Sequence, residues 1–104
     1  GLGGALFEEL AYDDQGQLLT GSFMDYLLPT ASDVPPITVI HMETPSPRNA
    51  FGFKGLGEGG CIAPPVVIAN AVCDALKPFK PELNRTPVRW QDVAAILDGD
   101  TPAG

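Results

Sequence analysis

A single carboxylate stands among glycines in the segment FKGLGEGG, residues 53–60. Glu58 is surrounded by small residues, and an apolar stretch begins a few positions later. The glycines on either side are Gly55, Gly57, Gly59 and Gly60. Glycine has no side chain and tolerates positive φ, so a loop rich in glycine brings backbone close to another group. We therefore expect a close approach of some group to this loop, with positive φ at Gly57.

A carboxylate in such a loop has the chemistry of a general base. A catalytic base must lie within hydrogen-bonding reach of the reacting proton, and removal from water raises the pKa of a carboxyl group toward the working range. The loop does not fit a phosphate cradle, because no Gly-Lys-Ser or Gly-Lys-Thr triplet closes it and Glu58 would repel a phosphate. A flexible linker would have the same composition, so the residues alone leave both interpretations open.

The other reactive side chains have simpler structural interpretations. Cys61 lies near a helix start, where the pKa of a thiol can fall, but a small buried cysteine explains it as well. Cys73 lies in the middle of an expected helix among apolar neighbours and fits the protein core. The sequence contains no second histidine with which His41 could share a metal ion. We therefore predict no metal ligand among the protein side chains. Glu8 and Glu9 are predicted to be exposed acids near a turn.

Composition limits the class of protein. The chain has 104 residues, of which 44% are hydrophobic, so we expect at most one domain with an ordinary globular composition. Thirteen acidic and six basic residues give a net charge of −7, which argues against partners such as nucleic acid or an anionic membrane. Two cysteines are too few for a disulfide scaffold, and no apolar run has transmembrane length. These features favour a cytoplasmic protein.

The elements that must position Glu58 can be read from periodicity. Residues 37–43, ITVIHME, are β-branched and alternate, which predicts a strand. Two apolar stretches on either side of the sequence DDQG predict a hairpin. Helices are expected over residues 66–76 and about 87–97, the second capped by Thr86. The expected fold class is therefore α+β: a hairpin, a strand, the glycine-rich loop and two C-terminal helices.

The helix expected at residues 66–76 is apolar over most of its circumference. Only Asn70, Asp74 and Lys77 form a narrow polar stripe. Such a helix is normally buried on most sides. A chain of 104 residues can hardly surround it, so we expect this chain to pack within a larger body.

The order of several motifs is similar to that of a known family. GALFEELAYDDQGQLLTGSFMDYLLPTASDVPPI, ETPSP and KGLGEGG followed by IANAVCDAL resemble the C-terminal stretch of the molybdopterin-binding large subunit of the xanthine oxidase family. The likeness is strongest to the carbon monoxide dehydrogenase and bacterial aldehyde dehydrogenase branch, and it extends to about residue 97. It implies that residues 1–104 are the C-terminal part of a molybdopterin-binding domain, incomplete alone.

The resemblance also implies a role for the glycine loop. In this family the glutamate of the GxGE motif is the catalytic base beside molybdenum, which here is Glu58. Gly55 and Gly57 would lie beside the cofactor, molybdopterin cytosine dinucleotide, which is shared with the rest of the subunit. The implied reaction is hydroxylation of a small-molecule substrate: an aldehyde, an N-heterocycle or carbon monoxide. Iron–sulfur clusters and FAD would be carried by partner subunits, and the isolated chain would be inactive.

The chain also departs from the family pattern. Cys61 and Ala63 stand where a threonine or another small residue and a glycine are usual. The loop that grips the cofactor is expected just before Gly1. Two alternatives therefore stay open: a non-catalytic structural or assembly chain that docks on a molybdenum enzyme, and a degenerate remnant of such a subunit.

Overall fold

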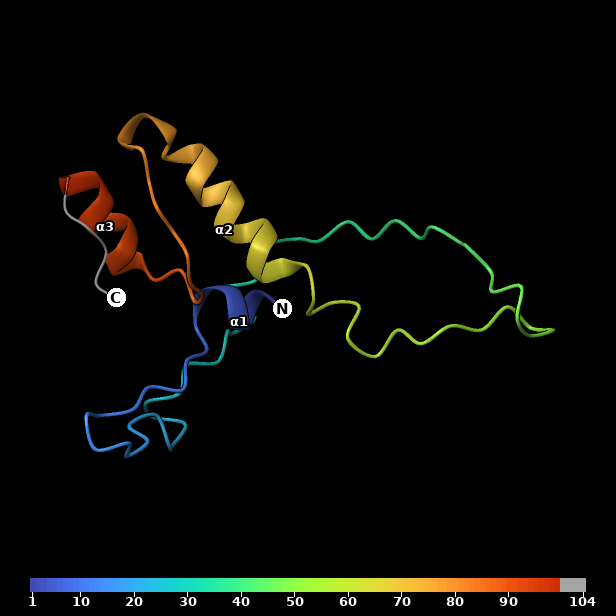
Figure 1. Ribbon diagram of the computed structural model, residues 1–104, viewed down its shortest axis with the longest axis horizontal. Helices are drawn as coiled ribbons and strands as arrows, with labels where there is room; N and C mark the ends of the chain where they lie inside the picture. The colour runs from blue at the N-terminus through green and yellow to red at the C-terminus, as the bar shows by residue number, and fades with distance from the viewer. Residues whose placement is uncertain (100–104) are drawn as a thin grey trace.

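The computed structural model describes residues 1–99. Within them the regular elements are, in chain order, α1 (Leu2–Leu6), α2 (Pro64–Ala75), the short 3₁₀ helix η1 (Lys77–Phe79) and α3 (Trp90–Asp98). Figure 1 shows the helices gathered on one side of the molecule, with α1 at the base of α2. Between these two helices the chain makes two irregular excursions, of which the second, residues 34–63, is called the long loop.

Helix α2 forms where the sequence predicts it. Pro64 and Pro65 occupy its first turn, where a backbone N–H would have no partner within the helix. No further proline or glycine follows until Pro78, just beyond the helix end at Ala75. Helix α1 packs against α2. The predicted helix at residues 66–76 is therefore confirmed, with both prolines in its first turn.

Helix α3 begins later than predicted. The helix expected from residue 87 starts at Trp90, and its N-cap is Arg89 rather than Thr86. Arg89 has extended backbone, with φ −83° and ψ 156°, so it cannot belong to a helical turn. The Val88 N–H donates to the Ala5 carbonyl oxygen at 2.7 Å, which docks the preceding residue on α1. The helix therefore begins only after Arg89.

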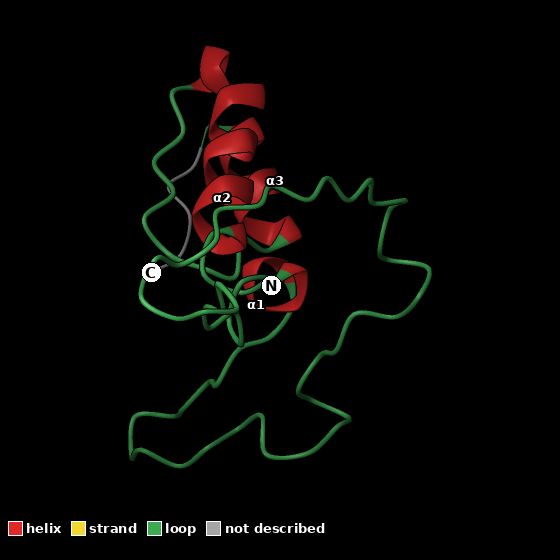
Figure 2. Cartoon of the chain, turned by 90° about the vertical axis from the view of Figure 1, so that its right-hand side faces the viewer, coloured by secondary structure: helices red, strands yellow, loops and turns green. Residues whose placement is uncertain are grey.

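The predicted strand at residues 37–43 is absent. This segment belongs to the long loop, all of its residues are exposed, and Figure 2 shows no strand in the described chain. A strand needs a neighbour to satisfy its N–H and C=O groups, and no segment within residues 1–99 pairs with this one. The predicted hairpin is reduced to one antiparallel bridge between Tyr12 and Leu18. The described fold is therefore helical with long loops, not α+β.

The core of the described chain is small. Its buried apolar side chains are Ala5, Val88 and Ile96. The radius of gyration is 17.7 Å, against about 13 Å for a compact chain of this length. The accessible surface is 8520 Å², against about 5600 Å² for a compact monomer of this mass. No residue of α2 is buried, so the chain alone does not cover the helix that was expected to lie inside.

Candidate functional site

Glu58 lies in the turn that ends the long loop and leads into α2. Its carbonyl oxygen accepts hydrogen bonds from the N–H groups of Cys61 at 2.9 Å and Ile62 at 3.2 Å. The N–H of Gly59 donates to the Leu56 carbonyl oxygen at 3.1 Å. The backbone at Glu58 is thus held on both sides. The exposed Glu58 side chain makes no hydrogen bond or ion pair with any of residues 1–99.

Gly55 and Gly57 border open space. A Cβ added to either residue would meet no atom within 4 Å, apart from its immediate chain neighbours. Neither has positive φ, so the positive φ expected at Gly57 is wrong. The glycines that do have positive φ in the described chain are Gly16, Gly52 and Gly99. The chain reverses at Glu58 through the hydrogen bonds to its carbonyl oxygen, and the glycines contribute room and accessible backbone instead.

The far end of the long loop is ordered by its own polar contacts. The Asn49 side chain donates to the Phe53 carbonyl oxygen at 2.9 Å and accepts the Phe53 N–H at 2.8 Å. The Lys54 ammonium donates to the Thr44 hydroxyl across the loop. The rings of Phe51 and Phe53 stack with their centroids 5.2 Å apart. The loop therefore has a defined shape although it is exposed.

Gly60 is the root of the glycine loop, where the loop approaches α2, and it lies against Gly1. A Cβ on Gly1 would collide with the Gly60 carbonyl oxygen and lie 2.5 Å from the Pro64 Cγ. Gly1 is also the N-cap of α1, and its carbonyl oxygen accepts the Ala5 N–H at 3.1 Å. Sequence reasoning missed this contact, because nothing in the sequence pairs residue 1 with residue 60.

The two acids predicted to be exposed are partly buried and paired. The Tyr26 hydroxyl donates to Glu8 Oε2 at 2.7 Å, and this hydrogen bond raises the pKa of Tyr26 above its ordinary value. Arg89 Nη1 donates to Glu9 Oε2 at 3.2 Å. The prediction for Glu8 and Glu9 is therefore wrong. These acids tie the N-terminal segment to residues that are distant in the sequence.

Asp92 is a second anchor that sequence reasoning missed. It is only 3% exposed, it pairs with Arg85 Nη2 at 2.8 Å, and it accepts the backbone N–H of Arg89 at 2.8 Å. Burial of an unpaired carboxylate is costly, and these partners offset the loss of water. The available signal was an acid three residues after the N-cap, a common capping position.

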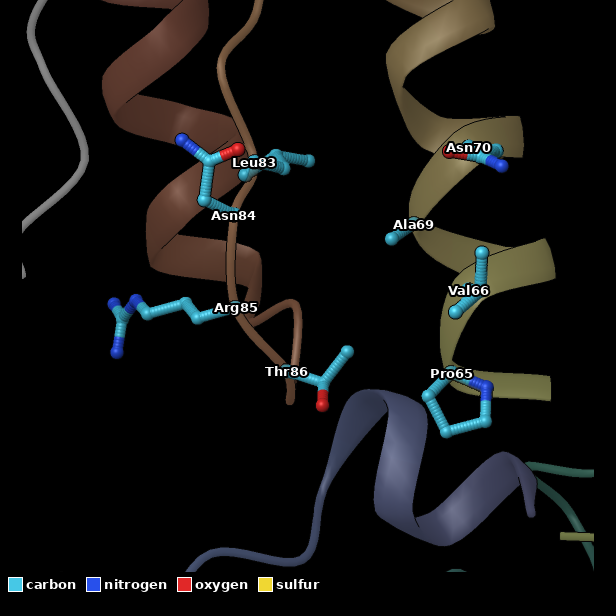
Figure 3. A pocket seen from close by; sticks show the side chains of 8 residues that line it. All are labelled: Pro65, Val66, Ala69, Asn70, Leu83, Asn84, Arg85 and Thr86. Atoms are coloured by element: carbon cyan, nitrogen blue, oxygen red, sulfur yellow. The ribbon is translucent and has the colours of Figure 1, made fainter. Parts of the chain in front are cut away.

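Two pockets of the described chain lie away from the glycine loop. One, of about 290 Å³, opens between the first turns of α2 and residues 83–86, where Figure 3 shows Arg85 extending away from α2. Another, of about 450 Å³, lies among α1, α3 and Val72 of α2. Neither contains Glu58, Gly55 or Gly57, so these pockets do not mark the predicted site.

Residues 1–99 contain neither a cluster of metal-binding side chains nor a membrane-spanning helix. No group of three or more His, Cys, Asp or Glu side chains in this range is placed to hold a metal ion. No helix in the same range has the length and apolar character needed to cross a bilayer.

Comparison with known proteins identifies the family. The family model of the molybdopterin cofactor-binding domain matches residues 1–35. The chain is 46% identical over 99 residues to the nicotine 6-hydroxylase large subunit of Paenarthrobacter nicotinovorans, an alignment that covers 95% of this chain and 12% of that protein. It is 42% identical over 71 residues to the carbon monoxide dehydrogenase large chain of Afipia carboxidovorans, an alignment that covers 68% of this chain and 9% of that protein.

A solved structure shares the fold. Quinoline 2-oxidoreductase from Pseudomonas putida 86 matches with a TM-score of 0.83 and 41% sequence identity, over 90% of this chain and 12% of that chain. Because so little of the chain is left out, most of the long loop belongs to the shared arrangement. The chain thus spans about an eighth of the length of such proteins. It belongs to the molybdenum-binding large subunits of the xanthine oxidase family and corresponds to a short stretch of one.

Proposed function

We propose that this chain supplies the catalytic base of a molybdenum hydroxylase, and that the base is Glu58. The observation that carries the proposal is the state of this side chain. Its backbone is fixed by hydrogen bonds to Cys61 and Ile62, while its carboxylate is exposed and has no partner within residues 1–99. In contrast, the buried Asp92 is fully engaged. A carboxylate that has no partner, on a backbone that is fixed, is available for proton transfer.

The residues around Glu58 fit a large cofactor. Gly55 and Gly57 border open space, so a bulky group can approach their backbone without meeting a side chain. We assign these two glycines to contact with molybdopterin cytosine dinucleotide, held jointly with the rest of the subunit. When bound, the cofactor supplies the redox centre that takes two electrons from the substrate. Iron–sulfur and flavin subunits are the proposed partners that carry these electrons onward.

The role of Glu58 in hydroxylation is proton removal. The oxygen nucleophile must lose a proton as it bonds to the substrate carbon, and a Glu58 carboxylate oxygen accepts that proton. The turn fixes the backbone from which the Glu58 side chain projects, which limits the region that its carboxylate can reach. For the substrate we favour an N-heterocycle over an aldehyde or carbon monoxide. The relatives named for nicotine and quinoline match 95% and 90% of this chain, at 46% and 41% identity, whereas the match to the carbon monoxide dehydrogenase large chain covers 68% of it.

The test is Glu58→Gln in the assembled enzyme. Glutamine keeps the shape but accepts no proton, so kcat should fall by at least about a hundredfold while the molybdenum content per subunit is unchanged. The matched control is Glu82→Gln, which neutralises another exposed glutamate outside the glycine loop and should keep full turnover. Full turnover in Glu58→Gln would instead favour the structural or assembly role.

A further inference from the structure

We propose that Gly1 is a positioning residue for Glu58, an inference that rests on the proposed role of Glu58 as the base. The backbone of Gly1 lies against the root of the glycine loop. A Cβ at this position would overlap the Gly60 carbonyl oxygen and would lie 2.5 Å and 3.0 Å from the Pro64 Cγ and Cβ. Both obstacles belong to backbone or to a proline ring, which cannot swing aside as the end of a long side chain can. Alanine at position 1 must therefore displace either the loop root or α1.

The loop root is mechanically connected to Glu58. Gly60 lies within the turn that the Glu58 carbonyl oxygen closes by accepting the N–H groups of Cys61 and Ile62. The acceptor is the peptide group of Glu58 itself. A shift at Gly60 is therefore passed to Glu58 in two ways: through the two peptide bonds between these residues, and through the two hydrogen bonds to the Glu58 carbonyl oxygen.

Helix α1 is held from the other side. The Val88 N–H donates to the Ala5 carbonyl oxygen at 2.7 Å, and Ala5 is fully buried. Arg89 is paired with Glu9 just beyond the helix. Helix α1 also packs against α2. Because α1 is fixed by these contacts, the displacement falls on the exposed loop, which has fewer contacts to resist it.

The experiment compares Gly1→Ala with Gly4→Ala in the cofactor-loaded enzyme. A Cβ at Gly4 meets no atom within 4 Å, so that variant adds the same methyl group to the same segment without a clash. Displacement of a catalytic group by about 1 Å can cost about a hundredfold in rate. We therefore expect kcat of Gly1→Ala to fall by about ten- to a hundredfold, with molybdenum content and melting temperature equal to those of Gly4→Ala.

A double variant separates positioning from general damage. If Gly1 acts through Glu58, then Gly1→Ala causes no further loss of kcat in the Glu58→Gln background, whereas a structural fault lowers kcat in both backgrounds. Three results would overturn the proposal: wild-type kcat in Gly1→Ala, additive losses in the double variant, or loss of molybdenum from Gly1→Ala. Full turnover in Glu58→Gln alone would remove the proposed function, and the inference with it. If kcat falls a hundredfold in Glu58→Gln but stays at the wild-type value in Gly1→Ala, the proposed function stands and only this inference is removed.

Discussion

Carboxylates in this chain are used in two opposite ways. Asp92 pairs with Arg85 beside the start of α3, and Glu9 pairs with Arg89 and joins two distant parts of the chain. Glu58 is exposed and pairs with nothing within residues 1–99, although its own peptide group is firmly hydrogen-bonded. A paired carboxylate lowers the energy of one conformation, whereas an unpaired one on a fixed backbone is available to a reacting group. Paired carboxylates therefore serve architecture in this chain, whereas Glu58 has no partner within residues 1–99, as the proposed base requires.

Gly57→Val should lower the molybdenum content and abolish turnover. Because Gly57 does not have positive φ and a Cβ there meets no atom of the chain within 4 Å, the valine should be tolerated by this chain's own fold. The added bulk would occupy the room that we assign to the cofactor. The measurement is molybdenum per purified subunit together with kcat.

The control for this change is Gly21→Val. Gly21 is also exposed and lacks positive φ, and a Cβ there has only an ordinary contact of 3.8 Å with Leu18. This variant should load the cofactor normally. A Gly57→Val enzyme with full molybdenum and full kcat would show that the space beside Gly57 is not used.

At the scale of elements, the sequence predicts what local rules decide. Helix α2 follows from the prolines at its start and an unbroken apolar run, and it forms as expected. The docking of Val88 on Ala5, just before α3, could not be predicted, because it joins residues that are far apart in the sequence. The prediction of a strand at residues 37–43 is wrong, because the alternation of apolar and polar residues favours extended backbone but does not specify a neighbouring strand. The residues around Glu58 were enough to predict it as a candidate base, but the proposed support of Glu58 by Gly1 could not be predicted from the sequence.

Helix α3 should depend on Asp92. Asp92→Ala removes the acceptor of the Arg89 N–H and the partner of Arg85, so the first turn of α3 loses both its cap and its buried ion pair. Loss of a cap and of such a pair costs about 1–3 kcal/mol, which corresponds to roughly ten- to a hundredfold faster local opening. Hydrogen exchange of the amides at residues 92–98 in the whole subunit measures this effect.

Asp74→Ala is the control for the Asp92 change. The Asp74 side chain is exposed on α2 and has no hydrogen-bond or ion-pair partner within residues 1–99. Exchange at residues 92–98 should therefore stay at the wild-type rate in this variant. Unchanged exchange in Asp92→Ala as well would mean that apolar contacts, such as those of Ile96, hold α3 without the ion pair.

At the scale of the molecule, the chain presents far more surface than its size requires. Its area exceeds that of a compact monomer of the same mass by about half. Part of the excess is the long loop, and part is the apolar flank of α2, where Val66 and Val67 are 62% and 59% exposed. An exposed apolar surface of this kind is typical of an interface. We propose that the rest of the molybdenum-binding subunit covers it.

The isolated chain should therefore exchange its α2 amides rapidly. Covering large apolar side chains is worth roughly 1.5–3 kcal/mol for each one that becomes fully buried, and the separate chain lacks that contribution. We expect amides 66–75 to be protected by at least about a hundredfold more in the whole subunit than in the isolated chain. Equal protection in the two would show that the chain is self-sufficient.

The pairing of Glu9 with Arg89 joins residues that are 80 positions apart. Closing so long a segment carries a large entropic penalty, and contacts of this separation tend to form late in folding. During synthesis, α1 and the glycine loop both leave the ribosome well before Arg89 does. The glycine loop is therefore made first and the contacts that we propose to support it last, so a nascent chain cannot complete the seat of this loop until Arg89 has emerged.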